Sequence, residues 1–584
     1  MSKLPEAIAV GRGDPIYMAH GYLTKVPIVA IMPFIEAFTE PNDVVLDVFA
    51  GSGMTGVAAA ALGRRAVMVD ISRLGQHIGL NYVNLVDSLA FLDAADAAVK
   101  RAQARMGDVY GVRCSHCQRT AQLAKTVQSV TVPCAGCGTT LVFYEVFKDA
   151  GWSKAKMRCA CGSPVNLKTQ RRNGEVAVLD YVDCPCTRTQ IEQPHTEPTG
   201  KLDATGMVWP DVEIGADRQM YAASALGLNG LTSTAKFFSP RNLAVLAALK
   251  EQIDAEPDEA IRSKLMFTFT AILARASKRY QWSPQRPLNA ANQTYYIAPV
   301  FYEWNVYDLF ARKARAIVKS DNYLRELRRA NQASEDINVR YEATSSHRLP
   351  LDDASIDYVF TDPPFGSNIF YSDMNLFHEA WLGRLTDHEN EAVVDRSGSR
   401  DAQRYEQLIT GALRECQRVL KEDGKLSLVF SNSSGKLWAL VQRAVREAGF
   451  RIQDDGIHLL DKGQRSVKGL ASGFENVVTM DLILTMTKCP DRDLPDLHDP
   501  SEAEVDAVVR EALAGARAPS PTHVYLTLLR EGLHSGWSLA RLDYALVAQA
   551  VRREGYTVDG STGRFVSDHE PRAEVLGGDP LPGL

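Results

Sequence analysis

Short apolar runs alternate with longer amphipathic segments at both ends of this chain. The runs at 43–49 and 65–70 are rich in β-branched residues, and the small-residue segment 53–62 lies between them. Runs of this length beside glycines are typical of buried strands, whereas the intervening segment has the length of a helix. Strand, helix and strand in that order predict a βαβ unit with a parallel sheet. An apolar helix is expected before it, over 26–38.

The same α/β pattern returns after a long interruption. The strands expected there lie at 337–343, 356–361, 424–430 and 476–487, with a helix over 434–448. The interruption holds a cysteine-rich section, 109–190, and a mostly helical section, 238–330. Because a structureless loop of about 250 residues is implausible inside a compact domain, we expect the insertion to fold separately. The predicted fold class is therefore α/β, a doubly wound, Rossmann-like sheet interrupted after its second strand.

This pattern divides the chain into five parts. They are 1–107 and 336–490 for the two halves of the α/β domain, 108–200 for a cysteine-rich insertion, 201–335 for a helical insertion and 491–584 for an acidic, proline-rich linker with a small helical module.

Composition and charge limit the kinds of surface and the cellular location that we expect. The chain has 584 residues, 45% of them hydrophobic, and a formal net charge of −6. A surface that binds nucleic acid must therefore be a local basic patch rather than a property of the whole molecule. Met1 to Tyr17 lack the apolar core of a signal peptide, and no apolar run reaches about 18 residues, so we expect a cytoplasmic protein without a membrane span.

A glycine-rich loop follows the first predicted strand. Gly51, Gly53 and Gly56 satisfy G-x-G-x-x-G, and Asp70 ends the next strand. Glycines let the backbone approach a ligand closely, and the acidic residue can accept hydrogen bonds from ribose hydroxyls. The loop alone leaves a dinucleotide and S-adenosylmethionine (AdoMet) open, although AdoMet has no pyrophosphate to place on a helix N-terminus.

The strongest chemical signal is the tetrapeptide Asp362-Pro363-Pro364-Phe365 at the end of the strand 356–361. Two prolines fix φ and hold the Asp362 side chain and the Pro363 carbonyl at the carboxyl end of the strand. Two such acceptors can grip the N–H groups of an exocyclic amine and direct its lone pair toward a methyl donor. A base must leave the duplex for this, and Phe365 is expected to stack on it.

The stretch DPPFGSNIFYSDMNLFHEAWLG resembles the N6-adenine DNA methylases that carry a zinc-ribbon domain. Similar stretches are HGYLTKVP, DVFAGSGMTG, FFSPRNLAVLAAL and MDLILTMTK, so the resemblance covers most of 15–490. It implies an AdoMet-dependent enzyme that methylates N6 of adenine in double-stranded DNA. It also implies partner proteins of a restriction-modification or phage-defence system.

The resemblance assigns roles to particular residues. The catalytic residues it implies are Asp362, Pro363, Pro364 and Phe365. Those implied for the cofactor are Thr24, Lys25, Asp47, Phe49, Gly51, Gly53, Thr55, Asp70 and Ile71. Tyr371 and Ser372 are expected either near the base or in packing. One departure is the sequence Glu342-Ala343-Thr344, where such enzymes often have Gly-Asp-Ala, so a contact from this strand to the adenine of AdoMet is in question.

Eight of the ten cysteines form close pairs between residues 114 and 186, which in a reducing compartment indicates metal binding. The spacing predicts one four-thiolate zinc site from Cys114, Cys117, Cys134 and Cys137. It predicts a second, less regular one from Cys159, Cys161, Cys184 and Cys186. Both would be structural, with one or two ions bound. Cys416 and Cys489 are expected to be ordinary buried thiols.

Residues 109–190 hold 11 Lys and Arg but 5 Asp and Glu. The candidates for phosphate contact are Lys154, Lys156, Arg158, Lys168, Arg171 and Arg172. A weaker candidate is the cluster over 278–282, KRYQW.

Three other functions stay open at this point. They are an N4-cytosine DNA methyltransferase, an RNA amino-methyltransferase and a zinc-ribbon subunit that binds nucleic acid without catalysis. A dehydrogenase is compatible only with the glycine loop, not with the Asp362 tetrapeptide.

Overall fold

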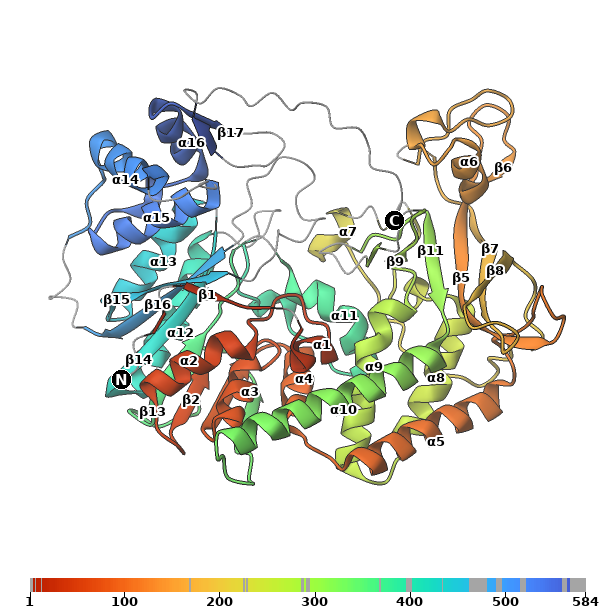
Figure 1. Cartoon of the computed structure of the whole chain (residues 1–584), viewed down its shortest axis with the longest axis horizontal. Helices are drawn as coiled ribbons and strands as arrows, with labels where there is room; N and C mark the ends of the chain where they lie inside the picture. The colour runs from red at the N-terminus through yellow and green to blue at the C-terminus, as the bar shows by residue number, and fades with distance from the viewer. Residues whose placement is uncertain are drawn as a thin grey trace.

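A computed structural model of the chain (Figure 1) describes most of its residues. They are 4–5, 7–11, 13–167, 170–223, 226, 229–284, 288–289, 295–366, 369–394, 402–432, 434–461, 480–489, 496–514, 521–558 and 565–567. Lys168 and the first part of the expected strand 476–487 lie outside these residues.

The main sheet has eight strands in the order β1-β15-β16-β14-β13-β2-β3-β12. Their bounds are β1 Ala7–Ala9, β2 Val44–Asp47, β3 Arg65–Asp70, β12 Val339–Ala343, β13 Ile356–Thr361, β14 Leu420–Phe430, β15 Phe450–Asp461 and β16 Met480–Lys488. β16 is antiparallel to both of its neighbours, and the remaining pairs are parallel. The α/β class and a mostly parallel sheet are thus confirmed.

Helices cover both faces of this sheet. Tyr358 and Phe360 point into one core with α2 (Ile28–Phe38) and α3 (Met54–Ala61). Val359 points into the other, with α12 (Ala402–Val419) and α13 (Gly435–Glu447). Alternate residues of a strand face opposite sides, so a strand covered on both sides is apolar throughout. This explains why these strands are continuous apolar runs in the sequence.

The chain reverses its direction across the sheet between β2 and β13. From β2 it proceeds outward through β3 to β12, and it returns to β13 on the other side of β2. β2 and β13 are parallel neighbours, with Val45 opposite Tyr358. Ligands of open α/β sheets bind in the crevice at such a reversal, beyond the carboxyl ends of the strands. The glycine loop and the Asp362 loop both begin at this crevice.

The insertion between β3 and β12 begins with α4 (Arg73–Val83) and α5 (Ser88–Met106) and contains a second sheet. Its strand order is β10-β9-β11-β5-β7-β8, and β4 and β6 also pair with β5. The bounds are β4 Gly111–Arg113, β5 Thr120–Pro133, β6 Thr140–Val142, β7 Gly174–Asp183, β8 Ile191–Pro194, β9 Tyr280–Gln281, β10 Leu288–Asn289 and β11 Val300–Trp304. Figure 1 shows this sheet on the right, at the far side of the molecule from the main sheet.

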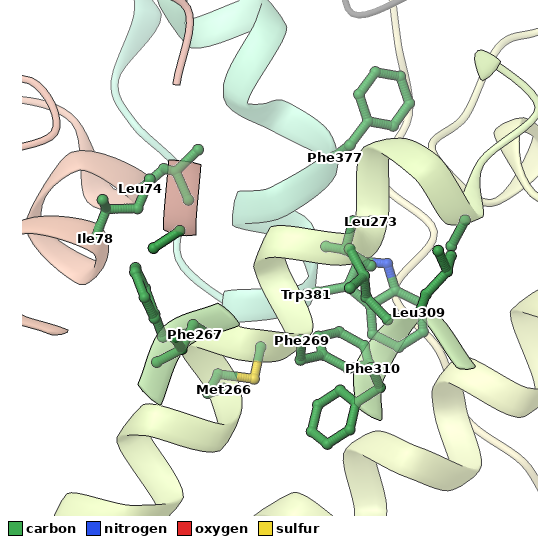
Figure 2. Close-up of a cluster of buried hydrophobic side chains, with 14 of the residues drawn as sticks. Leu74, Ile78, Met266, Phe267, Phe269, Leu273, Leu309, Phe310, Phe377 and Trp381 are labelled. Atoms are coloured by element: carbon green, nitrogen blue, oxygen red, sulfur yellow. The ribbon is translucent and has the colours of Figure 1, made fainter. Parts of the chain in front are cut away.

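The helices of the insertion join the two sheets. The expected helical section contains α8 (Pro240–Asp254), α9 (Glu259–Ala276) and α10 (Val306–Ala330), with β11 between the last two. Figure 2 shows α9 and α10 packed against α4 and α11 (Tyr371–Leu382) through buried apolar side chains. Phe269 of α9 meets Trp381 of α11 edge to face, with ring centroids 5.2 Å apart. The insertion therefore shares its core with the half of the chain that carries Asp362.

The C-terminal part contains α14 (Glu502–Ala514), α15 (Pro521–His534), α16 (Tyr544–Arg553) and the hairpin β17–β18 (Tyr556–Val558, Phe565–Ser567). Its apolar side chains continue the core around Trp438 of α13. Among the helices that the structure describes, none is both long and apolar enough to cross a membrane.

Candidate functional site

The glycine loop is fixed by contacts to the strands β3 and β12. The Gly51 N–H donates to the Asp70 carboxylate (2.8 Å), and the Gly51 carbonyl accepts from the Tyr341 hydroxyl (2.7 Å). Gly53 has φ 76°, and a Cβ there would lie 2.7 Å from the Gly79 Cα of α4. Glycine is therefore required at 53 by backbone conformation and by the approach of two helices.

A buried carboxylate joins the glycine loop to the strand that precedes the Asp362 loop. Asp47, at the end of β2, accepts from the Thr55 hydroxyl of α3 (2.6 Å) and from the Thr361 hydroxyl at the end of β13 (2.8 Å). It also accepts from the Phe49 N–H at 3.1 Å. Burial raises the Asp47 pKa to about 6, and these hydrogen bonds oppose that rise.

The Asp362 loop is held through its carbonyls. The Tyr405 hydroxyl donates to the Pro364 carbonyl (2.5 Å), and the Asn432 amide donates to the Phe365 carbonyl (2.9 Å). Asp362 is half-buried. The Phe365 ring packs edge-on against Phe430, with centroids 5.4 Å apart. These contacts fix the backbone of the loop.

Both loops line one cavity of about 1020 Å³, counting its open mouth. The predicted site residues that line it are Thr24, Lys25, Asp47, Phe49, Gly51, Thr55, Asp70, Ile71, Asp362 and Pro364. Gly53, Pro363 and Phe365 are not among the lining residues; Gly53 packs against Gly79, and Phe365 packs against Phe430.

Lys25 is engaged within the protein. Its ammonium group donates to the carbonyls of Tyr17 (2.5 Å) and His20 (2.7 Å) and lies 3.4 Å from the Tyr82 hydroxyl. Burial lowers its pKa to about 7. Because an ammonium has three donors, a contact to the carboxylate of a ligand would require Lys25 to exchange one of these partners.

Glu391 organises the wall opposite the glycine loop, and no sequence motif pointed to it. Its buried carboxylate accepts from the N–H groups of Tyr371 (2.6 Å) and Ser372 (3.2 Å) and from the Ser372 hydroxyl (2.5 Å). It thereby caps the first turn of α11 from outside the helix. The Tyr371 hydroxyl in turn pairs with the Thr24 hydroxyl at 2.9 Å, which connects the N-terminal segment to α11.

The end of β12 places no acidic side chain in the cavity, in line with the departure from Gly-Asp-Ala noted in the sequence. Glu342 is exposed and is not among the cavity-lining residues. Ser345, Ser346 and His347, just beyond the strand, line the cavity instead. Three polar residues after a strand that enters the crevice are the signal that could have identified them.

The eight paired cysteines form two four-thiolate clusters, but the predicted division between them is wrong. One cluster is Cys114, Cys117, Cys184 and Cys186, and the other is Cys134, Cys137, Cys159 and Cys161. The 14-residue strand β5 separates Cys117 from Cys134 by a length of up to roughly 45 Å. β7 runs antiparallel to β5 and returns Cys184 and Cys186 to the first knuckle.

Both clusters fit zinc. The sulfur atoms of Cys114 and Cys186 are 3.6 Å apart, and those of Cys137 and Cys159 are 3.7 Å apart. Thiolates at about 2.3 Å from a tetrahedral ion would be about 3.8 Å from one another. Four protein ligands fill each site, which indicates a structural role. Cys416 is buried, as expected, whereas Cys489 is half-buried.

Comparison with known proteins finds similarity to methylases over short parts of the chain. Residues 12–76 match the N6/N4 methyltransferase family, described as DNA methylase. Over 48 residues the chain is 50% identical to YubD of Escherichia coli (strain K12), which carries the name of a methylase. This match covers 8% of the chain and 21% of that protein, so the chain spans about a fifth of this relative.

A solved structure that resembles part of the chain is geranyl diphosphate C-methyltransferase from Streptomyces coelicolor A3(2), crystallised with Mg2+, geranyl diphosphate and S-adenosyl-L-homocysteine. The identity is 10% and the TM-score 0.16, over 30% of this chain and 61% of that one.

The cluster assignment predicts the zinc content of double variants. Cys117→Ser with Cys184→Ser should remove one ion of two, because both residues belong to one cluster. Cys117→Ser with Cys134→Ser should remove both ions. Atomic emission after gel filtration measures this, with Cys489→Ser as the control that keeps two. If Cys117→Ser with Cys184→Ser removed both ions and Cys117→Ser with Cys134→Ser removed one, the division expected from the spacing would be correct instead.

The buried Glu391 predicts a pH-dependent stability. Burial raises its pKa from 4.5 to about 7, so the folded state holds a proton that the unfolded state releases above pH 4.5. Stability from this group is therefore present below pH 4.5 and is lost as the pH rises through 7. Relative to wild type, Glu391→Gln should gain up to about 3 kcal/mol between pH 5 and 8.

Urea unfolding at a series of pH values measures this difference. Glu389→Gln, at an exposed neighbouring position, is the control and should track the wild type. A gap between wild type and Glu391→Gln that stays constant with pH would show that the Glu391 carboxyl does not titrate in this range.

Proposed function

We propose that the chain transfers a methyl group from AdoMet to N6 of adenine in double-stranded DNA, and its similarity to the N6/N4 DNA methylase family over residues 12–76 supports this. The observation that carries the proposal is the joining of the glycine loop to the Asp362 loop. Both line one cavity, and the Asp47 carboxylate bonds Thr55 on one side and Thr361 on the other. The glycine loop, which we assign to the cofactor, and the Asp362 loop, which we assign to the target amine, are thus connected through the same buried residue.

The chemistry of the lining fits AdoMet. Asp70 ends β3, and its carboxylate oxygens accept from the Gly51 and Ser72 N–H groups at 2.8 Å each. Each oxygen keeps a second lone pair for a ribose hydroxyl. The lining of the glycine-loop side includes neutral Thr24, Thr55 and Ser72 beside these carboxylates, which suits a cationic sulfonium without a phosphate. AdoMet, when bound, supplies the electrophilic methyl group.

The catalytic loop supplies two acceptors for the target amine. We assign the Asp362 carboxylate and the Pro363 carbonyl to the N–H groups of N6. Gripping both N–H groups removes the lone pair from conjugation with the ring and directs it at the methyl carbon, so the rate is gained by positioning and electrostatics. The Tyr405 and Asn432 hydrogen bonds hold the following carbonyls and so fix the aim of these acceptors.

The target base must leave the duplex to reach Asp362. An aromatic wall is available for it: Tyr22 and Tyr371 are stacked with centroids 6.3 Å apart, and both line the cavity. Phe365 follows Pro364 and packs against Phe430. We assign the part of its ring that Phe430 does not cover to contact with the base.

Asp362→Ala should lower the rate of methyl transfer by about 10²-fold or more, because it removes an acceptor aligned with the developing charge. AdoMet affinity should change little, since Asp70 and the glycine loop are untouched. Transfer of labelled methyl groups and isothermal titration measure the two quantities. Asp352→Ala, an exposed position before the same strand, is the matched control. Near-normal turnover of Asp362→Ala would remove Asp362 from the mechanism.

The labelled nucleoside decides among substrates. Incubation with unmethylated duplex DNA and, separately, with RNA should give N6-methyladenine from the DNA alone. Label in N4-methylcytosine would show that the target is cytosine rather than adenine. Label in RNA alone would overturn the assignment of DNA as the substrate.

A further inference from the structure

Cations and aromatic rings interleave on one face of the second sheet. Lys125 of β5 is directly opposite Tyr181 of β7 and Trp304 of β11, so the three side chains share a face. Tyr302, two residues before Trp304, lies on the same face. The other face packs against the helices, where Glu303 binds Arg241 of α8.

Three cations from three different elements converge on the Trp304 ring. Lys125 Nζ lies 4.7 Å from its centroid, and the guanidinium carbons of Arg275 (α9) and Arg312 (α10) lie at 5.5 and 5.7 Å. Lys125 also lies over the rings of Tyr181 (4.4 Å) and Tyr302 (4.8 Å). These separations are within the range of cation–π contacts. The rings therefore hold the cations in place without forming ion pairs with them.

The cations lack carboxylate partners within the described part of the chain, since none of the three forms an ion pair there. Asp183, Glu192 and Asp308 are near enough to act on the same groups electrostatically. Arg275 and Arg312 are exposed. Bringing like charges together raises the free energy, so an anionic partner that binds all three would relieve a repulsion already present.

Several basic residues that the sequence predicted to contact phosphate instead form contacts within the protein. Lys278 pairs with Glu175 at 2.7 Å, and Arg279 is buried with Phe377. Arg172 donates to the Ile297 carbonyl at 2.8 Å. Lys154, Lys156 and Arg158 are exposed near the second cysteine cluster.

We propose that the cation–aromatic face, defined as Lys125, Arg275 and Arg312 around Tyr181, Tyr302 and Trp304, binds the phosphate backbone of the substrate duplex. The identity of the anion as DNA rests on the proposed function. Contacts to phosphate position a duplex without reading its sequence, which suits cations held on rings rather than on base-reading loops.

Helix α10 connects the cation–aromatic face to the cavity that contains Asp362. Arg312 contributes to the face, and the next residue, Lys313, donates to the Ala19 carbonyl of α1 (Pro15–Ala19) at 3.0 Å. Tyr22 and Thr24, just after α1, line the cavity. A duplex anchored on this face is thus held by the same helix that supports one wall of the cavity.

The test is duplex binding as a function of salt. Fluorescence anisotropy with a labelled duplex, in the absence of AdoMet, gives the slope of log K against log[KCl] for the full-length protein. Arg275→Ala with Arg312→Ala should weaken binding more than tenfold at about 0.1 M salt and reduce the slope by about 2, because each lost phosphate contact removes about 0.9. Arg340→Ala with Arg451→Ala, an equal loss of exposed charge on the main sheet, should leave the slope unchanged.

Each further outcome decides the proposal. An unchanged slope in Arg275→Ala with Arg312→Ala, with Lys154→Ala and Lys156→Ala weakening binding instead, would place the contact near the second cysteine cluster and overturn it. The same slope change with RNA but not with duplex DNA would also overturn it. If the wild type transfers no methyl group to DNA yet the Arg275 and Arg312 variant alone loses binding, the face stands and the proposed catalysis fails. Retained zinc and AdoMet binding show that the variants are folded.

Discussion

The arrangement of the cavity depends on one buried carboxylate at the point where the main sheet reverses. Asp47 accepts hydrogen bonds from Thr55 of α3 and Thr361 of β13, which are more than 300 residues apart in the sequence. Burying a charge at this depth is costly, and the two threonine hydroxyls offset part of that cost when both segments are in place. The carboxylate therefore couples the two segments: if Thr55 moved away, one oxygen would lose its hydroxyl donor, and if Thr361 moved away, the other would keep only the Phe49 N–H.

The first turn of α11 extends this coupling to the insertion. Glu391 caps it, Thr24 bonds Tyr371, and Asp373 accepts from the Met220 N–H (2.9 Å) and pairs with Arg218 at 3.3 Å. Three separate parts of the chain thus meet on three consecutive residues beside the cavity. Because α11 also packs into the core shared with α9 and α10, a change in the insertion reaches the cavity wall through rigid helices rather than through a flexible linker.

Local patterns predicted what depends on local chemistry. The expected strands 65–70 and 356–361 coincide with β3 and β13 because burial on both faces makes a strand a continuous apolar run. Ten of the predicted site residues line the cavity, since strand ends and glycines mark a crevice in advance. Glu391 was missed because it caps a helix twenty residues earlier in the chain, which no local pattern encodes. The cysteine division was wrong because spacing counts residues, whereas the ligands are set by the length and direction of β5.

The nested arrangement of the cysteines bears on how the insertion folds. Cys117 and Cys184 close a loop of 67 residues, whereas the incorrect neighbours Cys117 and Cys134 are 17 residues apart. Loop-closure entropy in the unfolded chain favours the shorter, non-native chelate by about 1 kcal/mol. The inner cluster, whose ligands span residues 134 to 161, can form early, but the outer one must wait until β5 and β7 are paired. Zinc that bound before the hairpin was complete would favour the non-native chelate, and formation of β5, which separates the two knuckles, would favour the observed ligand sets.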